Sequence, residues 1–165
     1  MVKNTIAILG ATERCGVEVA KNLAKDNFRL LFFGHNNTQL TALAEEIQFL
    51  EPHADICCLD CLVDASWEAD IIISALPTCS ETDVARKIRE VVTQKILLIL
   101  VDRVDEMEVG SRLETDPTEM KQLMPNTRII KTSSSQFAAD IARAVASGRS
   151  IDSLIGDYNS QIPRL

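Results

Sequence analysis

The chain has 165 residues, 46% of them hydrophobic, which is enough for one domain with its own core. Its 24 acidic side chains outnumber its 17 basic ones, and the net charge of −7 leaves no basic surface for nucleic acid or anionic membrane. No apolar stretch approaches the roughly 20 residues of a membrane span, and no signal peptide precedes the first apolar segment. We therefore expect a single cytoplasmic domain over residues 1–165, with neither nucleic acid nor a membrane as partner.

The first element predicts a ligand site. Residues 5–9 form an apolar, β-prone segment, a turn containing Gly10 follows, and residues 15–25 carry small and apolar side chains at helical spacing. A strand that enters a helix through such a turn leaves unpaired N–H groups at the helix N-terminus. These groups and the helix dipole favour a phosphate or pyrophosphate.

The glycine spacing of this turn matches a dinucleotide fingerprint in part. The pattern G-x-G-x-x-G would need glycine at Thr12 and Cys15, whereas G-x-x-G-x-x-G fits Gly10 and Gly16 and has Glu13 in place of the middle glycine. A carboxylate at this position repels a pyrophosphate, and Arg14 can offset that charge or contact a phosphate itself. The alternative is an ordinary strand-to-helix turn kept for packing.

The rest of the chain alternates short apolar segments with amphipathic ones. Further strands are expected at residues 29–34, 54–59, 70–76, 95–101 and 127–131, with a seventh short strand at 151–155. Helices are expected after a cap at Asn37 or Thr38, after Ser80, after Asp116 and over 137–145, with a helical turn at 66–68. Residues 102–115 are polar and irregular, and we expect a loop with a short helix there. Such alternation predicts an α/β fold, a doubly wound parallel sheet in three layers of the Rossmann type.

Five cysteines, an odd number, indicate thiols rather than a disulfide framework. Cys57, Cys58 and Cys61 lie close together in sequence. We interpret them as small hydrophobic side chains in and after a buried strand, with a metal or redox site as the alternative, and predict no metal ligands.

Ligands of doubly wound sheets bind beyond the carboxyl ends of the strands, which selects four loops: those after the first, second and fourth strands, and residues 102–105 after the fifth. The second loop has no Asp or Glu for a ribose 2′-hydroxyl, which favours NADP over NAD. Small residues in the third loop would let a ribose approach the backbone. The run 132–136 either contacts the nicotinamide or substrate or caps the next helix. The candidate cofactor-binding residues are Gly10, Ala11, Thr12, Glu13, Arg14, Cys15, Gly16, His35, Asn36, Ala75, Leu76 and Pro77.

Several segments together resemble the N-terminal domain of the deazaflavin-coenzyme-dependent NADP oxidoreductases. They are Ile6–Gly10, Phe32–Asn36, Ala69–Pro77, Pro125–Thr132 and Leu154–Asp157, the last resembling the start of that family's next strand. The turn at Gly10–Gly16 alone also resembles that of atypical short-chain dehydrogenases. In the deazaflavin family a Ser-Arg pair holds the 2′-phosphate and a Phe-Asn pair follows the sixth strand. Here His35-Asn36 and Ser133-Ser134 stand at those positions.

The resemblance implies a Rossmann domain that binds NADP, followed by a small C-terminal domain that completes the deazaflavin site and often the homodimer. We therefore expect an oxidoreductase that moves a hydride to or from NADP, with an unidentified small-molecule acceptor. The sequence identifies no catalytic side chain for proton transfer, and direct hydride transfer between cofactors needs mainly orientation and a dry site. The alternative is a non-catalytic Rossmann module for nucleotide sensing or protein interaction.

Overall fold

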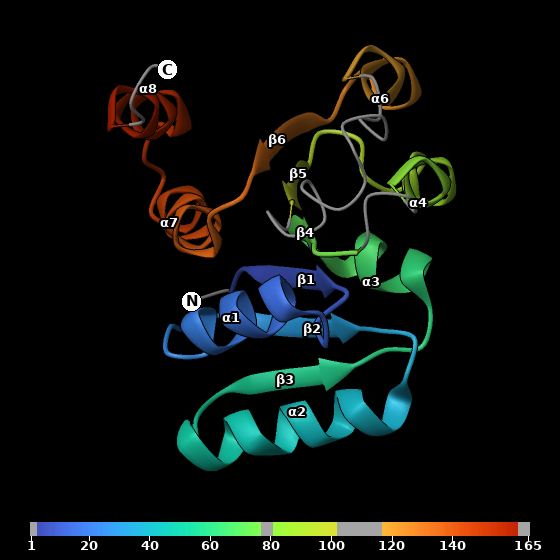
Figure 1. Cartoon of the computed structure of the whole chain (residues 1–165), viewed down its shortest axis with the longest axis vertical. Helices are drawn as coiled ribbons and strands as arrows, with labels where there is room; N and C mark the ends of the chain where they lie inside the picture. Colours follow the sequence, from blue (N-terminus) through green and yellow to red (C-terminus); the bar gives the residue numbers. More distant parts are fainter. Residues whose placement is uncertain (1–2, 77–80, 102–116, 162–165) are drawn as a thin grey trace.

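The computed structural model describes residues 3–76, 81–101 and 117–161 (Figure 1). The strands are β1 (Thr5–Leu9), β2 (Arg29–Phe33), β3 (Asp55–Cys58), β4 (Ile71–Ser74), β5 (Ile96–Leu100) and β6 (Arg128–Thr132). The helices are α1 (Arg14–Leu23), α2 (Asn37–Leu50), α3 (Leu62–Glu68), α4 (Glu81–Ile88), α6 (Pro117–Leu123), α7 (Ser135–Ala146) and α8 (Ile151–Gln161). The expected alternation of strands and helices is therefore confirmed.

All six strands are parallel, in the order β3-β2-β1-β4-β5-β6. The central strands β1 and β4 are buried along their whole length, and β5 is buried except at its first residue. Their aliphatic side chains point alternately to both faces, and helices cover both faces, so neither face of these strands can be polar. The strands β3 and β6 lie at the edges and carry the more exposed residues.

Two apolar clusters lie on opposite faces of the sheet. One combines side chains of α1, α2 and α7 with Ile6, Ile8 and other residues that point to that face. The other combines α3, α4 and α6 with Ala7, Leu9 and their neighbours. The chain runs outward from β1 to β3 and then returns to the centre at β4 (Figure 1). The fold is thus a doubly wound, three-layer α/β/α sandwich whose strand order reverses between β1 and β4.

The expected seventh strand at residues 151–155, and with it the strand start proposed at Leu154–Asp157, is wrong, because this segment is the helix α8. Gly148, with a φ of +72°, ends α7 and lets the chain turn. Ile151 and Ile155 then pack against the cluster on the α1 face, at a spacing of four that places them on one side of a helix.

Two smaller differences concern helix starts. The cap of α2 is Asn36 rather than Asn37 or Thr38, and its side-chain oxygen accepts the Gln39 N–H at 3.1 Å. The connector before β4 forms the seven-residue helix α3 rather than a single turn.

Some residues and segments for which the sequence made predictions lie outside the described residues. These are Pro77, Cys79, the cap at Ser80, the loop at 102–115 and the cap at Asp116. Among the helices that the structure describes, none is both long and apolar enough to cross a membrane.

Candidate functional site

The turn between β1 and α1 is built on two close backbone approaches. Gly10 has a φ of +77°, which side-chain-bearing residues rarely adopt. A Cβ placed on Gly16 would lie 2.1 Å from the carbonyl oxygen of Gly10. The first turn of α1 therefore rests on the end of β1 at a distance that only glycine permits.

Backbone hydrogen bonds fold this turn. The N–H groups of Gly10 and Ala11 both donate to the Phe33 carbonyl, at 2.8 and 3.1 Å, and the Glu13 N–H donates to the Gly10 carbonyl at 3.0 Å. The helix α1 begins at Arg14. The N-terminus of an α-helix presents main-chain N–H groups that the helix itself does not use. Because α1 starts a few residues after the end of β1, its positive dipole end lies at the carboxyl edge of the sheet. An anion placed there would meet several main-chain donors.

The loop after β4 lies against the same turn. The Ala75 N–H donates to the Leu9 carbonyl at 2.7 Å, and a Cβ on Gly10 would lie 3.1 Å from both the Ala75 carbonyl carbon and the Leu76 nitrogen. Ala75 and Leu76 are 8% and 5% exposed. Two of the four loops selected from the sequence thus meet where the strand order reverses, the position at which open α/β sheets bind ligands.

The loop after β2 completes the group. A Cβ on Gly34 would lie 3.3 Å from the Thr12 hydroxyl oxygen, so the first two loops touch. His35 is exposed and its ring lies edge-on to that of Phe33, with 6.1 Å between the centroids. The side chain of Asn36 caps α2. The backbone of this loop lies beside the turn, whereas its two candidate side chains have contacts within their own segment.

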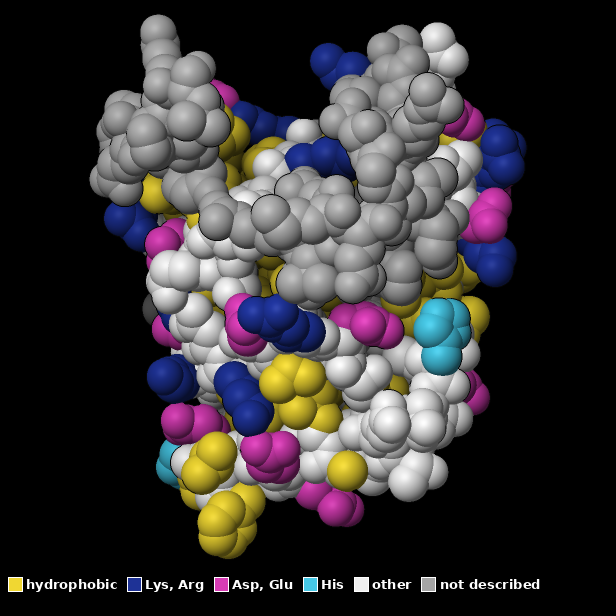
Figure 2. Space-filling view, viewed as in Figure 1, with side chains coloured by type: hydrophobic (Ala, Val, Ile, Leu, Met, Phe, Trp, Pro, Cys, Tyr) yellow, Lys and Arg dark blue, Asp and Glu magenta, His cyan; other side chains and the backbone are white. Residues whose placement is uncertain are grey.

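The charges near the turn are mixed. Glu13 stands at the N-cap of α1 in extended conformation and makes no side-chain hydrogen bond to the helix, while Arg14 is exposed. One turn further, the Glu18 carboxylate accepts the Ser135 hydroxyl of α7 at 2.9 Å. Over the described part of the face in Figure 2, Lys and Arg side chains alternate with Asp and Glu. The attraction for an anion would therefore come from the main chain more than from a basic patch.

The hydroxyl run after β6 is used within the chain. The Ser134 hydroxyl oxygen accepts the Phe137 N–H at 3.1 Å and caps α7, and the Thr132 hydroxyl accepts the Ser134 N–H at the same distance. The sequence allowed two roles for this run, contact with a ligand and capping of the next helix. Ser134 is found in the capping role.

The strand that carries Cys57 and Cys58 is a partly exposed edge strand and not the buried strand that the sequence predicted, because only β2 flanks it in the sheet. Among the described residues, no three His, Cys, Asp or Glu side chains are grouped to hold a metal. Burial, and secondarily the neighbouring Cys57, raises the pKa of the Cys58 thiol, whose sulfur lies 3.8 Å from the Leu40 carbonyl oxygen. The protonated thiol is thus favoured at Cys58.

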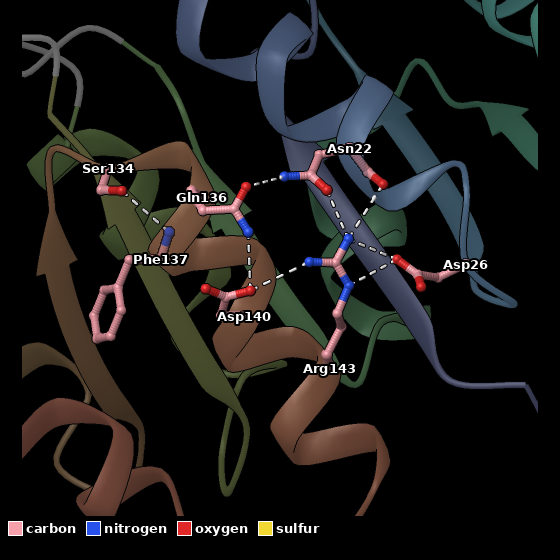
Figure 3. Close-up of polar contacts among 7 residues, drawn as sticks. All are labelled: Asn22, Asp26, Ser134, Gln136, Phe137, Asp140 and Arg143. Atoms are coloured by element: carbon pink, nitrogen blue, oxygen red, sulfur yellow. Dashed lines mark hydrogen bonds and ion pairs between the residues drawn. The ribbon is translucent and has the colours of Figure 1, made fainter. Parts of the chain in front are cut away.

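Sequence reasoning missed a polar network between α1 and α7 (Figure 3). The Arg143 guanidinium donates to Asp26 at 2.9 Å through Nε, to the Asn22 side-chain oxygen at 2.6 Å, and to Asp140 at 3.3 Å. Gln136 donates to Asp140 and accepts from the Asn22 side chain, both at 3.0 Å. A spacing of four and then three residues places Gln136, Asp140 and Arg143 on one face of α7. This spacing could have indicated that the three side chains lie together. From the sequence alone, however, such a polar helix face would be assigned to solvent.

Comparison with known proteins supports the fold class. No protein-family model and no curated protein matches the sequence. Solved structures do match: a shikimate 5-dehydrogenase from Mycobacterium fortuitum aligns at a TM-score of 0.57 and 16% identity, over 82% of this chain and 48% of its own. A protein described as an F420-dependent NADP reductase from Arthrobacter aligns at 0.56 and 17%, over 80% and 64%. A lactate dehydrogenase from Cryptosporidium parvum, solved with lactic acid and nicotinamide adenine dinucleotide, aligns at 0.57 and 12%, over 76% and 43%.

These matches place the chain in the Rossmann fold, the class that the strand order and the glycine turn define. The chain spans about half the length of the shikimate dehydrogenase that it matches.

Proposed function

We propose that this chain binds a nicotinamide dinucleotide and serves as the cofactor-binding unit of a cytoplasmic oxidoreductase. The observation that carries the proposal is the approach of Gly16 to the Gly10 carbonyl at the point where the strand order reverses. The turn before α1 lies against the loops after β2 and β4. In Rossmann folds the pyrophosphate binds at the start of this helix.

The residues of the three loops would share the dinucleotide between them. The first turn of α1, from Arg14 to Gly16, would hold the pyrophosphate, and the backbone at Ala75 and Leu76 would face the second ribose. We propose NADP rather than NAD because residues 34–39 contain no carboxylate to repel a 2′-phosphate. This loop has no Lys or Arg, so the side chains that would contact a 2′-phosphate are those of residues 35–38 and of the exposed Arg14.

The bound nicotinamide would supply hydride transfer, and the chain would supply orientation and exclusion of water. We propose that the acceptor is a second small molecule and that a deazaflavin coenzyme is the first to test, following the family resemblance. One solved neighbour is named for an F420-dependent NADP reductase. A homodimer that completes the acceptor site belongs to the same proposal.

A second candidate function is a nucleotide-sensing or protein-interaction module without turnover. Glu13 favours it, because a carboxylate at the N-cap of α1 opposes the anion that the main chain attracts. On this reading the fold keeps the geometry of the turn, but binding is weak or absent.

Titration of the purified protein with NADPH and with NADH, followed by nucleotide fluorescence, separates the two. Micromolar NADPH binding with oxidation in the presence of a deazaflavin or an artificial electron acceptor supports the oxidoreductase. Binding without turnover supports the sensor. If neither NADPH nor NADH binds, both nucleotide functions are refuted, and a protein-interaction module is the function that is left.

A further inference from the structure

The two halves of this fold are joined side by side, and a dinucleotide would lie across the join. The first half comprises β1 to β3 with α1 and α2, and the second comprises β4 to β6 with α4, α6 and α7. The halves share the ladder between β1 and β4, whose register pairs run from Ile6 with Ile71 to Leu9 with Ser74. Each half of a Rossmann sheet takes one mononucleotide of the cofactor, so its affinity depends on how the halves are set relative to each other.

The polar network of Figure 3, here named the α1–α7 brace, crosses this join. Its members are Asn22, Asp26, Gln136, Asp140 and Arg143. The first two belong to the first half and the last three to the second.

Arg143 is the hub of the brace. Its side chain is 29% exposed and pairs with Asp26, 35% exposed, with 2.8 Å between the guanidinium and a carboxylate oxygen. Its other donors reach the side-chain and main-chain oxygens of Asn22 and the Asp140 carboxylate. The planar guanidinium holds several acceptors in fixed directions, which suits it to fix an orientation as well as a distance.

Arg143 is too far along α7 to contact the dinucleotide. It lies eight residues after Ser135, the first residue of the helix, which is about 12 Å along the axis at 1.5 Å per residue. A direct charge effect over that distance is largely screened at physiological salt, where the Debye length is about 8 Å. Any influence on binding must pass through the placement of α7 against α1.

We infer that Arg143 is a positioning residue that sets the spacing of the two halves for a dinucleotide, an inference that rests on the proposed function. The brace and a bound dinucleotide restrict the same relative motion of α1 and α7. When the brace has already restricted this motion, binding of a dinucleotide costs less conformational entropy. The brace and dinucleotide binding are therefore positively coupled. A ligand confined to the first half gains nothing from the brace.

This difference gives a test that a merely structural role would not pass. NADPH would span both halves, whereas adenosine 2′,5′-bisphosphate would occupy the first half only. We expect Arg143→Met to weaken NADPH binding about tenfold, within the usual range of coupling between sites. The same variant should leave the affinity for adenosine 2′,5′-bisphosphate within about twofold, below a 0.5 kcal/mol difference.

Arg128 provides the matched control. It pairs with Asp152, joining β6 to α8, so both partners lie on the same side of the join. Arg128→Met removes the same charge and the same kind of ion pair, and should change neither affinity by more than about twofold. If Arg143→Met does not fold, Asn22→Ala and Gln136→Ala each remove one part of the brace at an exposed contact and should show the same selectivity.

The outcomes are separable. Selective loss of NADPH binding in the brace variants, with Arg128→Met unchanged, supports the inference. Equal losses for both ligands, or no loss, overturn it while leaving the proposed function intact. A wild-type protein that binds neither ligand refutes the proposed function and this inference with it.

Discussion

Replacing Gly16 by alanine tests the close approach on which the candidate site depends. The added Cβ would lie 2.1 Å from the Gly10 carbonyl oxygen and 3.0 Å from the Ala11 Cα, both of them main-chain atoms. Because no flexible side chain can move aside, the start of α1 must shift by about 1 Å. Such overpacking costs up to about 3 kcal/mol, and the better helix propensity of alanine returns about 1 kcal/mol. We expect a net loss of about 2 kcal/mol.

Gly156 is the internal control, because it too is a helical glycine. A Cβ placed there meets nothing within 4 Å, so Gly156→Ala should raise stability by up to about 1 kcal/mol through helix propensity alone. Thermal unfolding should then show Gly16→Ala about 4–8 °C below wild type and Gly156→Ala slightly above it.

Nucleotide titration of the same two variants completes the test. Moving the first turn of α1 misplaces the N–H groups that would meet the pyrophosphate, so Gly16→Ala should bind NADPH at least about tenfold more weakly. Gly156→Ala should bind like wild type. If both alanine variants are equally stable, the close approach is not as described, and the reasoning that derives the site from it is refuted.

Three further predictions concern other groups. Glu13→Gly should tighten NADPH binding, with Glu13→Gln intermediate, since repulsion is removed; an unchanged dissociation constant would show that this carboxylate is not the obstacle. NADPH should slow alkylation of Cys15, which lies in the first turn of α1, and leave the rate at Cys58 unchanged; mass spectrometry of digested peptides measures both. Burial lowers the pKa of the Lys95 ammonium, which donates to the Trp67 carbonyl at 2.6 Å and lies 6.0 Å from the ring centroid. Trp67 fluorescence should therefore show a transition below the usual lysine pKa, and Lys95→Met should abolish it. Between the lowered pKa of the folded chain and the usual pKa of the unfolded chain, the free energy of unfolding should rise with pH, because the unfolded chain still holds this proton.

The central strands could be read from the sequence because their cause is local. Runs such as Ile71–Ile73 and Ile96–Leu100 are aliphatic without alternation, which fits only strands covered on both faces. The glycine turn could also be predicted from the sequence, since Gly10 and Gly16 are six residues apart and constrain one continuous segment. The predicted loops after β1, β2 and β4 do meet, because parallel strands present their carboxyl ends at one edge.

The segment after α7 shows where local reading fails. Ile151, Leu154 and Ile155 are compatible with a strand by composition and with a helix by spacing. In the structure the segment is a helix beside α7, and Ile151 and Ile155 pack against the cluster on the α1 face. The cap of α2 is a similar case. Three adjacent polar residues could cap this helix, and the place where β2 ends decides that Asn36 does so.

The sequence by itself determined the layered fold, its strand-turn-helix start and the edge at which a ligand would bind, because each follows from periodicity or glycine spacing within a few residues. Only the tertiary structure decided that Ser134 caps α7, that Glu18 meets Ser135, and that Arg143 joins the two halves of the sheet. The last two contacts join side chains 117 residues apart. No local pattern specifies such a pair, since it exists only once the sheet has brought α1 and α7 together.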